Sequence, residues 1–174
     1  MNYAYLAALM AAAAAMLFDL KTGRIPNILA AIIGVTGIAC HFMGMGVQGL
    51  FSFLVGASLP AVLLMPLFRF RMMGAGDIKL LMGLGGILGF PDSLHLLAWS
   101  FVLGGLLAAI QMALVTGFRE RFQYFIDYVI YTIWTGRITP YRREGGGPEN
   151  FPFTVPIFAA VAVMIVRKMV ILGN

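Results

Sequence analysis

Long apolar runs alternate with short polar loops along the whole chain. Six runs are predicted to be membrane-spanning helices, at about residues 3–19, 27–45, 48–68, 77–90, 94–117 and 151–172, and the fourth is short and glycine-rich. A helix needs roughly 20 mostly apolar residues to cross the hydrocarbon core of a bilayer. The pattern therefore predicts an all-α membrane protein, a polytopic bundle of about six transmembrane helices.

The segment of about 118–150 follows a different pattern. Its apolar side chains recur at helical spacing, with Arg119, Arg121 and Asp127 elsewhere on the turn. An apolar stripe beside a charged face is typical of a helix that lies in the membrane interface. We expect one amphipathic interfacial helix here, acting as a platform for a membrane-bound substrate or as a simple anchor. The whole of 1–174 is then a single membrane-embedded domain.

Composition agrees with this pattern and limits the partners. Of the 174 residues, 61% are hydrophobic and 11% are charged, whereas about a quarter are charged in soluble domains. The net charge is +5, but the basic residues are split among short loops, so we expect the lipid bilayer and no nucleic acid as partner. Cys40, His41 and His95 do not form a metal-ligand pattern, and neither a metal nor another cofactor is expected.

The basic residues also predict an orientation in the membrane. The second and fourth loops hold no Lys or Arg, whereas the first, third and fifth hold ten: Lys21, Arg24, Arg69, Arg71, Lys79, Arg119, Arg121, Arg137, Arg142 and Arg143. Cytoplasmic loops carry such an excess, so these three loops are expected to face the cytoplasm, as in a multi-pass protein of the inner (cytoplasmic) membrane. Arg167 and Lys168 conflict with this count, because six spans place them near the outer end.

Two carboxylates abut long apolar runs. Asp19 closes the first predicted helix and Asp77 opens the fourth, so both are expected at the same depth on the cytoplasmic side. Two neighbouring carboxylates cannot both ionise easily and tend to share a proton. One can then activate a water while the other protonates a peptide carbonyl. In the alternative interpretation each aspartate caps a helix or pairs with a nearby base, Asp19 with Lys21 or Arg24 and Asp77 with Lys79.

Glycines surround the second aspartate. Gly74 and Gly76 lack a Cβ, so the backbone beside Asp77 can approach a substrate strand closely. Later glycines have a spacing that permits tight helix packing, and we expect them to be structural: Gly83, Gly85, Gly86 and Gly89. On this basis Gly76→Val is expected to be far more damaging than Gly86→Val.

Three segments resemble one family, in the same order along the chain. GAGDIKLL resembles the GxGD motif of the type IV prepilin peptidases, and FDLKTGRIPN resembles their first motif. FPFTVPIFAA is similar to the Pro-rich opening of their last helix. The resemblance implies that Asp19 and Asp77 are the catalytic pair. It also implies supporting positions near the site: Gly74, Gly76, Lys79, Arg24, Pro26 and Asn27.

The function implied by the resemblance is that of a membrane-embedded aspartyl endopeptidase. Such an enzyme cleaves the short basic leader of a prepilin or pseudopilin, a substrate with an N-terminal hydrophobic helix, at the cytoplasmic face. Larger family members carry a cytosolic insertion linked to N-methylation, but only seven residues separate Asp19 from Asn27. We therefore expect no N-methyltransferase activity, as in the short peptidases of tight-adherence (Flp) pilus systems. A small ion- or proton-coupled transporter and a non-catalytic scaffold of a pilus or secretion apparatus remain alternatives.

Overall fold

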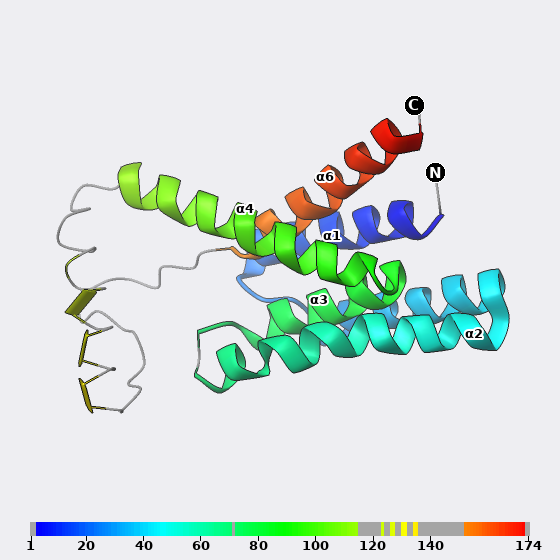
Figure 1. The fold of residues 1–174 in the computed structure, drawn as a ribbon, viewed down its shortest axis with the longest axis horizontal. Helices are drawn as coiled ribbons and strands as arrows, with labels where there is room; N and C mark the ends of the chain where they lie inside the picture. Colours follow the sequence, from blue (N-terminus) through cyan, green and yellow to red (C-terminus); the bar gives the residue numbers. More distant parts are fainter. Residues whose placement is uncertain are drawn as a thin grey trace.

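The chain folds into a bundle of helices (Figure 1). The computed structural model describes residues 3–70, 72–114 and 152–172, with isolated positions between 123 and 135. The helices described are α1 (Tyr3–Thr22), α2 (Asn27–Arg69), α3 (Ala75–Leu88), α4 (Asp92–Leu114) and α6 (Thr154–Leu172). No strand occurs within these ranges, so the prediction of an all-α protein is confirmed. The predicted amphipathic helix of about 118–150 lies outside the described residues.

Helix α2 consists of two segments that run back along each other. At Gly46 the backbone leaves the helical region, with φ 60° and ψ −137°, a conformation that glycine adopts without steric cost. A Cβ on Gly37 would lie 2.8 Å from the ring of Phe53. In one straight helix these two residues would be about 24 Å apart. The chain therefore reverses at Gly46, between the predicted spans 27–45 and 48–68, and Figure 1 shows the two segments of α2 joined at the right of the view.

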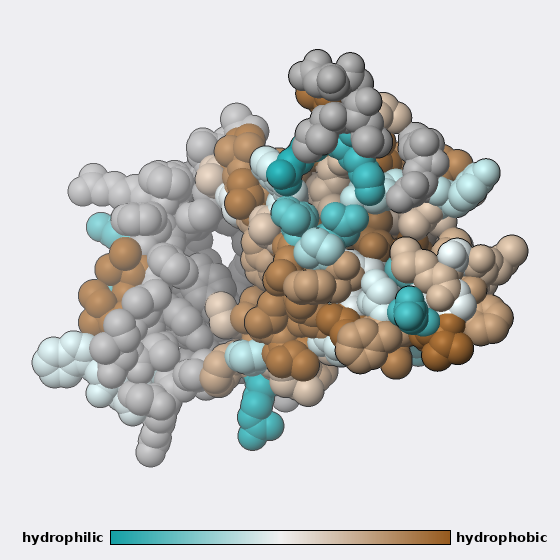
Figure 2. All heavy atoms as spheres, turned by 45° about the vertical axis from the view of Figure 1, so that its right-hand side comes forward, coloured by the Kyte–Doolittle hydropathy of each residue, from teal (hydrophilic) through white to brown (hydrophobic). Residues whose placement is uncertain are grey.

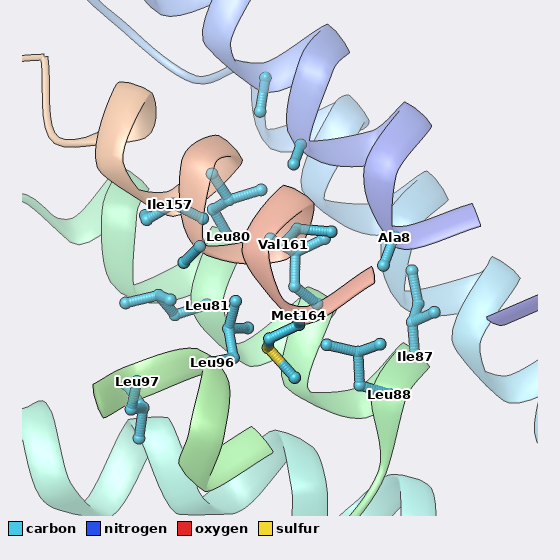
Figure 3. Packing of buried hydrophobic residues seen from close by; sticks show 14 of the residues in the cluster. Ala8, Leu80, Leu81, Ile87, Leu88, Leu96, Leu97, Ile157, Val161 and Met164 are labelled. Carbon is cyan, nitrogen blue, oxygen red and sulfur yellow. The ribbon is translucent and has the colours of Figure 1, made fainter. Parts of the chain in front are cut away.

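Helix α3 lies at the centre and is enclosed by the other helices (Figure 1). Its large side chains are almost all buried: Ile78, Leu80, Leu81, Leu84, Ile87 and Leu88. Figure 3 shows side chains of α4 and α6 packing around them, including Leu96, Leu97, Ile157, Val161 and Met164. On α1 the buried positions are the small residues Ala8, Ala12 and Ala15. Small residues let the backbones of neighbouring helices approach closely.

Glycines of α3 form its contact with α2. A Cβ on Gly83 would lie 2.7 Å from Ile33, and one on Gly86 would lie 2.5 Å from the ring of Phe53. Real Cβ atoms are essentially never that close to another heavy atom, so these positions admit only hydrogen without a shift. The expectation that these later glycines serve helix packing is confirmed by this geometry.

The described surface is predominantly hydrophobic, as the face in Figure 2 shows. Large apolar side chains are exposed on several helices, for example Met10, Ile28, Phe51 and Val102, which expose 61–76% of their area. Soluble monomers rarely expose contiguous apolar surface on this scale. A surface of this kind is suited to contact with lipid.

Three helices are long and apolar enough to cross a membrane, judged by length and composition over the described residues: Tyr3–Thr22, Asn27–Arg69 and Asp92–Gln111. The prediction of six spans is therefore not confirmed. Part of the difference comes from α2, whose 43 residues count as one helix although its two segments, on either side of Gly46, correspond to two predicted spans. Another part comes from α3, whose 14 residues reach only about 21 Å, less than the roughly 30 Å of the hydrocarbon core.

A polar cluster joins α1, α4 and α6 at the end of the bundle where α1 begins. Tyr5 Oη donates a hydrogen bond of 2.6 Å to Asp92 Oδ2, and Lys168 Nζ lies 4.2 Å from the centre of the Tyr5 ring. An ammonium group over an aromatic face is held by the ring's quadrupole. The predicted place of Lys168 near the outer end of the last helix conflicted with the count of basic loop residues. Its charge is thus stabilised by a specific contact with Tyr5.

Candidate active site

Asp19 lies in the last turn of α1, where a tight turn closes the helix. The N–H of Gly23 donates to the carbonyl of Asp19 at 2.7 Å, and Gly23 has a φ of 63°, the left-handed conformation that commonly ends helices. Arg24 follows as an exposed residue. Pro26, with φ −61° and ψ 138°, is the N-cap of α2. The short loop therefore returns the chain beside the end of α1, with Asp19 half-buried at the turn.

Asp77 lies in the first turn of α3, and Gly74 is the N-cap of that helix. The carboxylate folds back over this cap, because a Cβ on Gly74 would lie 3.1 Å from Asp77 Oδ2. Glycine at this position thus leaves room for the carboxylate. Gly76 is less constrained, since a Cβ there would meet Ile25 at 3.5 Å, an ordinary contact. The crowding expected at Gly76 therefore does not arise for a Cβ.

The two carboxylates interact electrostatically. Asp77 belongs to α3, which is not among the helices long enough to cross the membrane. The pKa of Asp77 is raised from 3.8 to about 6, first by burial and second by the negative charge of Asp19, while the backbone of Gly74 acts to lower it. Burial and a like charge both disfavour an ionised carboxyl group. The structure thus brings Asp19 and Asp77 into one electrostatic site, although they are 58 residues apart in sequence.

A third polar side chain, Thr154, was not predicted from sequence. It is the first residue of α6 and is fully buried. Its hydroxyl donates a hydrogen bond of 2.8 Å to Asp19 Oδ2. The segment FPFTVPIFAA drew attention for its prolines, but nothing in it pointed to the threonine. Only a search for polar residues at the ends of apolar runs would have selected this position.

The basic residue nearest Asp77 in sequence has a different partner. Lys79 Nζ donates to Asn27 Oδ1 at 2.9 Å, a bond that connects α3 to the first residue of α2. The partner described for Asp19 is Thr154, not a base of the loop that follows it. The ion-pair interpretation is therefore not what the structure displays. The helix-cap interpretation holds in part for Asp77, whose carboxylate lies against the backbone of its own N-cap.

The site consists of acid–base groups from three helices: carboxylates from α1 and α3 and a hydroxyl from α6. No group of three or more His, Cys, Asp or Glu side chains that could hold a metal ion occurs in the part of the chain that the structure describes. A carboxyl group whose pKa is near 6 can be a proton donor in the neutral range, and a neighbouring ionised carboxylate can accept a proton. Such a pair can carry out general acid–base chemistry on a bound water.

Comparison with known proteins gives one match. The model of the type IV leader peptidase family matches residues 6–109, which is more than half of the chain. The matched region contains Asp19 and Asp77 together with α2 and α3, whereas α6 and Thr154 lie outside it. No curated protein and no solved structure matches the chain.

Proposed function

Because the chain belongs to the type IV leader peptidase family, we propose that it is a membrane-embedded aspartyl endopeptidase that removes the short basic leader of prepilin-like substrates. The observation that carries this proposal is the meeting of two carboxylates from different helices. Burial and the charge of Asp19 raise the pKa of Asp77 to about 6. Two carboxyl groups in unequal protonation states are what peptide hydrolysis by a carboxylate pair requires.

The proposed hydrolysis has two steps. In the first, one carboxylate takes a proton from a water whose oxygen attacks the peptide carbonyl carbon, while the other carboxyl group protonates the carbonyl oxygen. A neutral gem-diol results. In the second, the C–N bond breaks as the first group returns its proton to the amine nitrogen. The second group regains a proton from a gem-diol hydroxyl, so both carboxyl groups recover their starting states.

We place the cleavage on the cytoplasmic side of the inner membrane. Support comes from the basic residues at the aspartate end of the bundle, Lys21, Arg24, Arg69 and Lys79, which are all exposed. Positive residues are retained on the cytoplasmic side of membrane proteins. The substrate's hydrophobic helix would lie in the bilayer against the apolar outer faces of the bundle, which brings its basic leader to the level of the two aspartates.

We propose leader removal without N-methylation. Helix α1 ends at Thr22 and α2 begins at Asn27, so the connection is a tight turn with no room for the insertion associated with methyl transfer. This short form is the one that the resemblance links to tight-adherence pili. The substrate is accordingly a prepilin or pseudopilin with an apolar N-terminal helix.

Substitution of each aspartate by asparagine tests the function. Asn keeps the size of the side chain but cannot transfer the proton, so Asp19→Asn and Asp77→Asn are each expected to abolish leader removal from a co-expressed prepilin. Both variants should remain in the membrane fraction at the wild-type amount. Asp92→Asn is the matched control, because Asp92 binds Tyr5 at the other end of the bundle, and it should retain cleavage. Near wild-type processing by either variant at position 19 or 77 would refute the proposal. A transporter or a scaffold would give no cleavage even with the wild-type chain.

A further inference from the structure

Thr154 is a buried polar residue at the start of an apolar helix. Its side chain is fully buried, and its hydroxyl is 2.8 Å from Asp19 Oδ2, across 135 residues of sequence. An ionised carboxylate can only accept hydrogen bonds, and a hydroxyl has one proton to donate. A donor fixed at this distance holds its acceptor in one orientation. The contact therefore distinguishes the two carboxylates from each other.

We propose that Thr154 is a positioning residue that orients the carboxylate of Asp19, so that Asp19 is the base that takes the proton from water and Asp77 is the acid. This inference rests on the proposed peptidase function and adds the division of roles between the two carboxylates. Thr154 acts through Asp19 and needs no contact with the substrate.

The surroundings of Thr154 fix its position. Backbone hydrogen bonds close the first turn of α6, from the N–H of Val155 to Pro152 and from the N–H of Ile157 to Phe153. Farther along α6, buried side chains pack against the central helix (Figure 3). The hydroxyl is therefore presented by a rigid element.

The charged groups around Asp19 do not provide the same selection. On α3, Asp77 carries a like charge, and Lys79 is bonded to Asn27. Lys21 and the loop residue Arg24 are exposed to solvent screening. The cations of α6 lie near its other end. Among the described residues, Thr154 is thus a side-chain donor that bonds to Asp19, whereas the carboxylate of Asp77 lies against the backbone of Gly74.

The test compares Thr154→Val, which removes the hydroxyl at nearly constant volume, with Thr154→Ser, which keeps it. Hydrogen bonds to charged groups are worth enough that kcat for prepilin cleavage is expected to fall roughly ten- to hundredfold in Thr154→Val, with little change in KM. Thr154→Ser should restore kcat. Ser93→Ala, which removes a buried hydroxyl bonded at 2.7 Å to the backbone of Gly56, should leave kcat unchanged.

Several outcomes would overturn the inference. Thr154→Val with the wild-type kcat would exclude a role for the hydroxyl. Equal losses of kcat in the Val and Ser variants would reduce Thr154 to a packing residue. The proposed function fails separately, if wild-type protein does not cleave prepilin or if the asparagine variants do. In that event a double-mutant cycle of Thr154→Val and Asp19→Ala on the thermal midpoint still decides whether the contact exists, because additive effects would exclude it.

Discussion

The contact between Gly86 of α3 and Phe53 of α2 gives a quantitative test of the bundle. In Gly86→Ala the new Cβ would lie 2.5 Å from Phe53 Cε2, in a ring that also lies beside Gly37 on the first segment of α2. Overpacking of this kind destabilises proteins by about 1–3 kcal/mol. Gly34→Ala is the matched control, since nothing lies within 4 Å of its Cβ position, and it gains the same helix propensity.

The assay is thermal unfolding in detergent, followed by circular dichroism. A penalty of this size should separate the midpoints of Gly86→Ala and Gly34→Ala by roughly 2–12 °C for a chain of this length. Phe53→Leu should partly rescue Gly86→Ala, with a coupling of about 0.5–3 kcal/mol. Gly76→Ala should behave like the control, because Ile25 is 3.5 Å away. Equal unfolding midpoints for Gly34→Ala and Gly86→Ala, or no rescue of Gly86→Ala by Phe53→Leu, would refute the packing described for α2 and α3.

Three further predictions concern the site and its side of the membrane. The pKa of Asp77 is about 6, against 3.8 for a free carboxyl group, so its proton is lost as the pH rises through about 6 and cleavage should decline above that pH. Asp19→Asn removes the second cause of the shift and leaves burial, the first, so the ¹³C NMR titration midpoint of Asp77 should fall but stay above 3.8; an unchanged midpoint would show that the two groups do not interact. The last prediction uses a Cys40→Ser background into which single cysteines are introduced. A cysteine that replaces Thr22 or Met72 should resist an impermeant thiol reagent in intact cells, whereas one that replaces Gln48 should react. Labelling of Thr22 and Met72 from opposite sides would exclude a shared site.

The sequence predicted the helices well, because an apolar run and the turn that ends it are both local features. The predicted break between 27–45 and 48–68 contains Gly46, where α2 reverses. Asp19 and Asp77 could be selected because charges at the ends of apolar helices stand out. The number of spans could not be predicted in the same way, since the 14 residues of α3 are apolar enough to resemble a span and too short to form one alone.

The interactions that the sequence did not predict depend on partners far along the chain. Thr154 bonds to a carboxylate 135 residues away, and a threonine in the first turn of a helix is otherwise typical of an ordinary cap. An added Cβ is more crowded at Gly86 than at Gly76, a difference that the sequence did not predict. It depends on whether Ile25 or Phe53 lies opposite, which only the packed bundle determines.

The enclosure of α3 has a consequence for how the chain is made. During synthesis, α3 leaves the ribosome before α4 and α6 exist. Its 14 residues are too few to span the bilayer stably without a partner helix. The helix already present is α2, whose Ile33 and Phe53 side chains pack against the glycines of α3. We expect α3 to insert by docking on α2 and to be covered by the later helices afterwards. Variants that weaken this docking should therefore expose the chain to membrane quality-control proteases and reduce the amount of protein, while the molecules that do assemble turn over substrate at the normal rate.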